Sequence, residues 1–508
     1  MQDKVLPSIP TVSEADREKT PTSVKGLVLS LVSRVEALET QFEDLRAENA
    51  QLRAENEHLK EKLQRNSQHS SQPPSADKAK GVKAQKKPRS SRARGGQPGH
   101  SGKGPRLYSS EACERIENYY PSQCHHCGEQ LSGEDPAPYR VQKVDVPKIV
   151  PVVVEHRFHQ LGCECCGALT RGWDAAVINS PMYGERLTGL VGWLSSVGHQ
   201  SHRQVKDLLS EVFDIEISTG GINRLRMELS ESLSSIVESA GEYIEHQAQV
   251  NMDETGFRQG NGDGKNPQNS KGWLWVVVSP LVSYFSVFLS RSQTVAQEML
   301  GDRFGGIVGS DRCGAYSWLC NEQRQVCWAH LKRDFTKIAE RTGGSTKVGK
   351  ALLKQQKQLF DLWYQVRDGT LTRDDFRAQV KPIRRELRRL LEDAAHHEIE
   401  TGDKTPFAKT VRTCRKMLTV EPAFWTFVEN DGVEPTNNAA ERALRPAVLW
   451  RKQSFGVNSQ QGSQFVARMM TTVTSLKAQQ RSVFDFLSDA IKASRYGSTS
   501  PSLLPERD

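Results

Sequence analysis

The sequence contains no apolar run long enough to cross a membrane. A helix needs about 20 consecutive apolar residues to span the hydrocarbon core of a bilayer. The most apolar stretch, residues 273–289 (WLWVVVSPLVSYFSVFL), is shorter than that and is interrupted by Ser-Pro and Ser-Tyr. It therefore predicts two β-strands, and no membrane is expected among the partners of the chain.

The first residues also lack the basic start and apolar run of a secretory signal peptide, so a cytoplasmic location is expected. Cysteine is sparse, with ten residues in 508. In a long cytoplasmic chain, such cysteines indicate metal ligands or free thiols and not disulfide bonds.

Acidic residues are absent from Lys78 to Arg106, a stretch that carries ten Lys and Arg side chains. The net charge of the whole chain is only +8, so the distribution of charge along the chain is more informative about partners than the net charge. Such a run is typical of a solvated tether, and it also suits contact with a phosphate backbone. With 508 residues, 26% charged and 36% hydrophobic, the chain has room for three to four domains with real cores.

A heptad repeat predicts a coiled coil over residues 27–64, after a disordered segment 1–26. The d positions are Leu31, Leu38, Leu45, Leu52 and Leu59. Two a positions carry asparagine (Asn49 and Asn56), which costs stability but fixes register and favours a parallel dimer. The e and g charges are opposite in sign across such a pair, so a homodimer is expected. The alternative is a single amphipathic helix packed on its own domain.

Two CxxC motifs predict a zinc ribbon over residues 111–180, after a basic flexible linker at 65–110. The four thiols are Cys124, Cys127, Cys163 and Cys166. The gap between the two motifs is long, and a strand-like stretch at residues 141–159 is expected to form a hairpin that bridges it. With four protein ligands, a Zn²⁺ site here would be structural. Free thiols, or His125 or His126 as substitute ligands, are the alternatives.

Residues 181–245 read as helices and resemble a helix–turn–helix. Ser218 or Thr219 would cap the second helix. Its first turns offer Asn223, Arg224 and Arg226, side chains that could contact base edges in a major groove. A helical subdomain with basic surface residues is the alternative.

In residues 246–335 the periodicity of apolar residues changes from helix-like to strand-like, and this segment contains two aspartates of interest. Asp253 lies on the first predicted strand, and Asp311 follows a later short one. Alternation puts Glu254 on the opposite face from Asp253. Strands with a crossover helix predict a mixed α/β sheet. A helical insertion at 336–425, a last core part with C-terminal helices at 426–495 and a tail at 496–508 complete the chain.

Residues 434–446 read EPTNNAAERALRP. If Asn438 caps a helix, Glu441 can close a capping box. The alternative is that Glu441 is a metal ligand whose partners lie far away in the chain. On a helix it shares a face with Arg445, a candidate phosphate contact. Pro446 disfavours helix at Arg445, so the helix is expected to break there and restart.

Four further residues are candidates for contact with DNA: His330, Arg333, Arg451 and Lys452. A buried structural histidine and a solvated basic surface are the ordinary alternatives. Cys313, Cys320, Cys327 and Cys414 have no ligand-like spacing and are expected to be packing residues.

Several motifs together resemble the transposases of insertion sequence family 66. They are NMDETGF, GSDRCGAY, CWAHLKRDF, PTNNAAERALRPAVLWRK, the GGQPGH linker, the paired CxxC motifs and the N-terminal zipper. They occur in the order of that family and cover nearly the whole chain. The resemblance implies a ribonuclease-H-like α/β core with a helical insertion, so the fold class is multidomain, α/β and α.

The resemblance also implies a catalytic triad of Asp253, Asp311 and Glu441 that binds Mg²⁺ or Mn²⁺. The implied activity is DNA transposition, with strand cleavage at transposon ends and strand transfer into target DNA. A bacterial protein, bound to the nucleoid when on DNA, and accessory element-encoded proteins are implied as well. Two rivals remain: a non-enzymatic zinc-containing DNA-binding regulator with a decayed core, and a nuclease that cuts without joining.

Overall fold

The computed structural model describes residue 13 and residues 18–19, 21–64 and 107–505. Most of the segment predicted to be disordered and of the basic linker lies outside these ranges. The chain divides into two compact units, residues 1–85 and 86–508, and each is described by itself.

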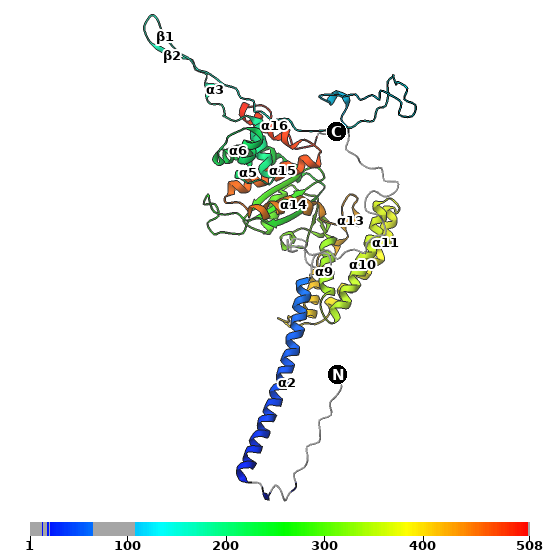
Figure 1. Cartoon of the computed structure of the whole chain (residues 1–508). Helices are drawn as coiled ribbons and strands as arrows, with labels where there is room; N and C mark the ends of the chain where they lie inside the picture. The colour runs from blue at the N-terminus through cyan, green and yellow to red at the C-terminus, as the bar shows by residue number, and fades with distance from the viewer. Residues whose placement is uncertain (1–12, 14–17, 20, 65–106, 506–508) are drawn as a thin grey trace. The chain divides into compact units, whose positions relative to one another are not determined.

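The first unit contains one long helix, α2 (Thr22–Gln64), drawn in blue in Figure 1. Its 43 residues span about 65 Å at 1.5 Å per residue. The heptad leucines whose side chains are described, Leu31, Leu38, Leu45 and Leu52, are 50–62% exposed. The helix is thus as predicted from residue 27 onward, and its apolar stripe is exposed.

Residues 107–180 contain little regular structure. They include the 3-10 turn η2 (Ser110–Ala112), a short antiparallel pair, β1 (Gln160–Gly162) with β2 (Leu169–Arg171), and α3 (Ala175–Ile178). The strand predicted over 141–159 is not formed, and valines such as Val152 are exposed. Pro147 and Pro151 interrupt this stretch, and proline cannot donate to a ladder of hydrogen bonds.

Four helices follow, as expected for residues 181–245. They are α4 (Glu185–Ser196), α5 (His202–Phe213), α6 (Thr219–Ser232) and α7 (Ser234–Glu245). The first three enclose a small apolar core that includes Val191, Leu209 and Ile222. Ser218 caps α6 by accepting a hydrogen bond from the N–H of Gly221, one of the two caps predicted.

A five-stranded sheet forms the centre of the second unit, in the order β5-β4-β3-β6-β7. Its strands are β3 (Gln249–Gly256), β4 (Trp273–Val278), β5 (Ser283–Phe288), β6 (Ile307–Ser310) and β7 (Arg324–Val326). β3 pairs antiparallel with β4 and parallel with β6, and β7 pairs parallel with β6. The mixed α/β sheet is therefore confirmed, with β3 at its centre.

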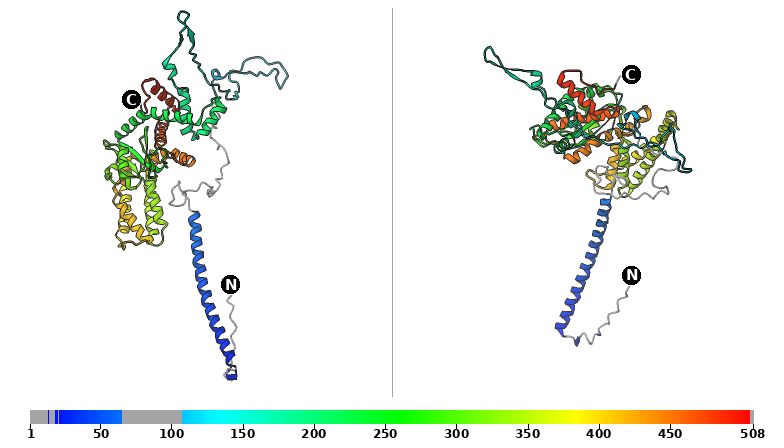
Figure 2. Two further views of the ribbon diagram at one scale, coloured as in Figure 1. Left: turned by 90° about the vertical axis from the view of Figure 1, so that its left-hand side faces the viewer. Right: turned by 45° about the horizontal axis from the view of Figure 1, so that its top comes forward.

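Helices cover both faces of this sheet. On one face lie α7, α14 (Asn438–Ser454), α15 (Gln460–Ala478) and α16 (Val483–Tyr496), the last three coloured orange to red in Figure 2. On the other face lie α8 (Gln293–Leu300) and the turn η3 (Gly314–Tyr316). Consecutive residues of β3 therefore face different cores, because strand side chains alternate.

A helical insertion separates β7 from α14. It comprises α9 (Trp328–Ala339), α10 (Gly344–Arg367), α11 (Arg373–Ala395), α12 (Pro406–Leu418) and the short turns η5 (Pro422–Phe424) and α13 (Thr426–Glu429). Trp328 and Trp425 meet edge to face at 5.2 Å in its core. No helix in the described part of the chain is both long and apolar enough to span a membrane.

Candidate active site

The register of β3 and β6 brings two aspartates to neighbouring positions. Asn251 lies opposite Gly309 in this parallel pair. The same offset, continued by two residues, sets Asp253 beside Asp311, which directly follows β6. Neighbouring strands are about 4.8 Å apart, so Asp311 lies near Asp253, and its charge acts on both Asp253 and Glu254.

The chain around Asp311 is held in place by buried polar contacts. Its Oδ1 accepts a hydrogen bond of 2.7 Å from the N–H of Cys313. The buried guanidinium of Arg324 on β7 donates to the carbonyl of Asp311 at 2.8 Å. The second aspartate thus sits on a fixed turn and not on a free loop.

Glu254 faces away from Asp253, as predicted from alternation. Its carboxylate is buried under the other face of the sheet, where Arg291 donates to it at 2.6 Å. The hydroxyl of the fully buried Tyr316 donates to its other oxygen. This network ties β3 to the turn that follows Asp311, so Glu254 is a structural residue here.

Glu441 lies in the first turn of α14, which packs against β3. Asn437 precedes the helix, and no capping box forms, so that local reading is wrong. The side chain of Asn437 instead donates to the carbonyl of Met252 at 2.8 Å, and its N–H donates to Cys327 Sγ at 3.1 Å. These two bonds attach the start of α14 beside Asp253.

Pro446 does not break α14, which runs without interruption from Asn438 to Ser454. The expected break at Arg445 is therefore wrong. Pro446 is exposed, and the buried alanines Ala440, Ala443 and Ala447 lie on the opposite, sheet-facing side. Packing of that side outweighs the single lost backbone hydrogen bond.

Asp253 is buried and is acted on by nearby negative charges. Burial raises the pKa of Asp253 well above its ordinary value, and the charges of Glu254, Asp311 and Glu441 raise it further. The N–H of Glu254, which donates to Asp253 Oδ1 at 2.9 Å, acts in the opposite direction and lowers the pKa of Asp253. A divalent cation would relieve this repulsion, and carboxylate oxygens are the ligands that Mg²⁺ prefers. The donor set therefore fits such an ion.

Glu441 also belongs to a second group of ligand atoms. One ligand atom from each of Cys327, His330 and Glu441 lies within 4.8 Å of the other two. In the described residues, no other set of three or more His, Cys, Asp or Glu meets this limit. Cys327 is buried, which raises the pKa of its thiol to about 11. The sequence interpretation took Cys327 for packing only. The CxxH spacing of Cys327 and His330 could have indicated a pair of metal ligands. It could not indicate Glu441, which lies far away in sequence.

His330 and Arg333 lie on α9 and face Glu441. His330 Nδ1 is 3.6 Å from Glu441 Oε1 and has no hydrogen-bond partner, while Arg333 Nη2 lies 3.3 Å from the same oxygen. Burial, together with the charge of Arg333, lowers the pKa of His330. The imidazole of His330 and the guanidinium of Arg333 thus border Glu441.

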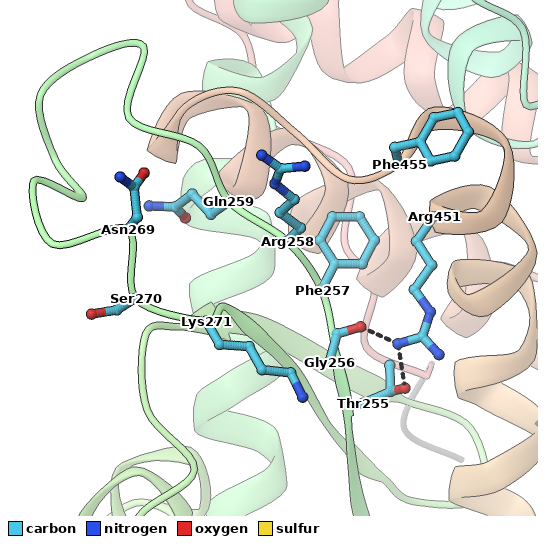
Figure 3. Close-up of a pocket in the computed structure, with 10 residues that line it drawn as sticks. All are labelled: Thr255, Gly256, Phe257, Arg258, Gln259, Asn269, Ser270, Lys271, Arg451 and Phe455. Atoms are coloured by element: carbon cyan, nitrogen blue, oxygen red, sulfur yellow. Dashed lines mark hydrogen bonds between the residues drawn. The ribbon is translucent and has the colours of Figure 1, made fainter.

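The predicted basic residues of α14 separate into two places. Arg451 donates to Thr255 Oγ1 at 2.9 Å and to the carbonyl of Gly256, and lines a pocket near the end of β3 (Figure 3). Arg445 is exposed and lines a different cavity of about 380 Å³ with His199. Lys452 is exposed.

The helix–turn–helix candidates differ in exposure. Asn223 and Arg224 are exposed on α6. Arg226 instead turns into the fold, with its guanidinium 4.1 Å from the ring centre of Phe465 and in contact with His202. Burial lowers its pKa to about 10.

The two CxxC segments fold alike. In each, the N–H of the glycine after the motif, Gly128 or Gly167, donates to the carbonyl of the first cysteine at 2.8 Å. Both glycines have positive φ (78° and 71°). Backbone N–H groups and the second thiol of each motif lower the pKa of Cys124 and of Cys163. The four sulfur atoms do not lie within 4.8 Å of one another.

The fold and site define a mixed α/β protein with a buried carboxylate, Asp253, on its central strand and further carboxylates nearby. Comparison with known families gives the particular class: the family described as "Transposase IS66 family" matches residues 182–465, more than half of the chain. The chain belongs to this transposase family, as the sequence motifs predicted. A family of unknown function matches residues 10–106.

Similar proteins occur in Sinorhizobium fredii. The uncharacterized protein y4qI is 26% identical over 407 residues, which cover 74% of this chain and 71% of the relative. The uncharacterized protein y4jD is 23% identical over 281 residues, or 51% of this chain and 52% of the relative. Family membership indicates a DNA-processing transposase, and these names add no activity of their own.

Proposed function

We propose that this protein is a DDE-type transposase with a ribonuclease-H-like core, which cleaves DNA strands at insertion-sequence ends and joins them to target DNA. What supports the proposal is that the charges of Asp311, which directly follows β6, and of Glu441, in the first turn of α14, both act on Asp253 of β3. Carboxylates gathered in this way suit phosphoryl transfer, in which positioning and charge stabilisation do most of the work.

In this proposal Asp253, Asp311 and Glu441 hold Mg²⁺ or Mn²⁺. When bound, such ions supply an activated nucleophile and stabilise the leaving oxygen of a phosphodiester. Asn437, through its bond to the carbonyl of Met252, fixes the start of α14 and so orients Glu441. Arg333 and His330 border Glu441 and are suited to contact the scissile phosphate.

The other modules would bring the protein to its substrate. The exposed Asn223 and Arg224, together with the basic linker, would contact DNA, and Cys124, Cys127, Cys163 and Cys166 would bind structural zinc. The exposed heptad leucines of α2 support a homodimer, which could hold two DNA ends together. Accessory element-encoded proteins would join this assembly.

The test is cleavage and joining of a duplex that carries the DNA flanking the gene. Glu441→Gln, Asp253→Asn and Asp311→Asn should each lower Mg²⁺-dependent strand cleavage by more than about 100-fold, since a negatively charged ligand oxygen is lost. Binding of the same duplex should stay within about twofold of wild type. Glu434→Gln is the matched control, because Glu434 is exposed in the loop before α14.

Three outcomes separate the rivals. Full cleavage by Glu441→Gln overturns the triad. Binding without any cleavage by the wild-type protein indicates a DNA-binding regulator. Cleavage without strand transfer indicates a nuclease.

A further inference from the structure

A basic pocket lies at the end of β3, apart from the carboxylates. It has a volume of about 730 Å³ and is shown in Figure 3. Its lining residues are Thr255, Gly256, Phe257, Arg258, Gln259, Asn269, Ser270, Lys271, Arg451 and Phe455. This volume is within the range of small-molecule sites.

The charge of the lining has one sign. Arg258, Lys271 and Arg451 contribute three cations, and no lining residue is acidic. Arg258 and Lys271 are exposed. Arg451 uses one guanidinium nitrogen to bind Thr255 and Gly256, so its remaining nitrogens stay available to a ligand. The pocket therefore favours an anion.

Phe455 adds an exposed aromatic ring to this basic pocket. It is 80% exposed and has a φ of 59°, which is unusual for a bulky residue. The next residue, Gly456, has a φ of 104°, and a Cβ there would lie 2.3 Å from the carbonyl oxygen of Arg258. The segment at Gly456 can therefore approach the segment at Arg258 only because residue 456 is glycine. The same close approach leaves Phe455 in an uncommon backbone conformation at the pocket.

Backbone hydrogen bonds hold Phe455 in that position. The N–H of Val457 donates to the carbonyl of Arg258 at 2.9 Å, and the N–H of Gly260 donates to the carbonyl of Val457 at 2.8 Å. The ring is therefore presented by a fixed segment. Strained and exposed residues held in this way are a recurring feature of binding sites.

The pocket and the carboxylates lie along the same pair of elements. Thr255 is two residues after Asp253 on β3, about 7 Å further along and on the same face. Arg451 is ten residues after Glu441 on α14, about 15 Å along the helix. A strand whose scissile phosphate lies at the carboxylates can therefore reach the pocket within a few nucleotides.

We propose that this pocket binds an unpaired nucleotide of the DNA strand, with its base stacked on Phe455 and its phosphate held by Arg258, Lys271 and Arg451. The proposal rests on the proposed function, because it assumes a DNA strand at the carboxylates. Every base has a π-face, so stacking tolerates any sequence, and flanking cations hold the backbone. A paired base cannot reach such a ring, so the pocket distinguishes unpaired from paired ends.

The experiment compares two labelled DNAs by fluorescence anisotropy, with the full-length protein in magnesium-free buffer so that nothing is cut. One is a blunt duplex, and the other is the same duplex with three unpaired nucleotides at one end, tested with both polarities. Phe455→Ala should weaken binding of the DNA with unpaired nucleotides by roughly 5- to 150-fold and leave blunt-duplex binding unchanged. Phe455→Trp should retain the tight binding.

Charge and location controls complete the test. Arg258→Ala and Lys271→Ala should each reduce the salt dependence of binding by about one phosphate contact, whereas Phe455→Ala should not. Tyr364→Ala, which removes an exposed aromatic ring from α10, should leave both affinities unchanged. With 5-iododeoxyuridine at an unpaired position, irradiation should crosslink the DNA to the peptide that contains Phe455.

The outcomes are distinguishable. Equal binding of both DNAs by wild type and Phe455→Ala, or a crosslink elsewhere, overturns the pocket while leaving the transposase proposal intact. Equal loss of both DNAs in Phe455→Ala, with an unchanged melting temperature, also overturns it. Failure of the wild-type protein to bind any DNA overturns both proposals.

Discussion

Asp253 is the residue on which the account depends most. It lies on the central strand, mostly buried, with Asp311 beside it and Glu441 across from it. Without a cation, folding forces its negative charge close to others of the same sign. This repulsion, together with burial, raises the pKa of Asp253, and carboxylates at functional sites often have raised pKa values.

This conflict predicts the effect of Asp253→Asn on stability. Because the pKa of Asp253 is higher in the folded than in the unfolded chain, its contribution to stability is fully present below the ordinary Asp pKa and is lost as the pH rises through the folded pKa. In metal-free buffer near pH 7, the variant should be more stable than wild type by roughly 1 kcal/mol, or about 2–4 °C in melting temperature.

The check is thermal unfolding between pH 4 and pH 8. The difference should shrink toward pH 4, and added Mg²⁺ should stabilise the wild type more than the variant. Asp302→Asn, at an exposed position, should change nothing. A variant less stable than wild type at pH 7 would contradict this reading of Asp253.

Local strand patterns placed Asp253 on a strand and Asp311 after one, and the family resemblance suggested their role as ligands. Neither indicated that Cys327 lies beside His330 and Glu441. The thiol acquires its neighbours only when the start of α14 comes to lie beside Cys327, which brings Glu441 and the N–H of Asn437 to it. Contacts between residues more than 100 positions apart leave no local pattern.

At the scale of elements, local rules failed where tertiary contacts were stronger. The capping box at Glu441 and the break at Pro446 were both wrong, because β3 fixes Asn437 and the sheet core fixes the alanine face of α14. The strand at 141–159 was wrong as well, since prolines interrupt it. The order of strands and helices in the core was predicted correctly from periodicity.

The helical insertion depends on a close contact between α9 and α10. A Cβ on Gly349 of α10 would lie 2.2 Å from the backbone nitrogen of Ala339 on α9. Gly349→Ala should therefore force the helices apart and lower stability by about 1–3 kcal/mol. Thermal unfolding measures this.

The control for that prediction is Gly344→Ala, on the same helix. Its Cβ would meet only ring atoms of Phe407, at 3.4 Å and beyond, and alanine favours helix. It should unfold close to the wild-type temperature. Equal effects of the two substitutions would show that the α9–α10 contact does not set stability.

At the scale of the whole molecule, α2 predicts the oligomeric state. Its exposed leucines repeat every seven residues, and such a stripe is stable in water when a second helix covers it. The double variant Leu38→Lys and Leu45→Lys should convert a dimer to a monomer at micromolar concentration in analytical ultracentrifugation.

The matched control adds the same charge on the outer side of α2. Thr40→Lys and Ala47→Lys lie two residues after those leucines, at positions that face solvent in a parallel dimer. This protein should remain dimeric. A monomeric wild type, or a dimeric leucine variant, would contradict the coiled coil.

In the proposed active site, three carboxylates from distant parts of the chain bind the same divalent ions. Anomalous diffraction from crystals of the full-length protein soaked in Mn²⁺, which prefers oxygen ligands, tests this binding. We expect anomalous density bounded by carboxylate oxygens of Asp253, Asp311 and Glu441. Manganese bound only beside Cys327 and His330, or none within ligand distance of Asp253 and Asp311, would contradict it.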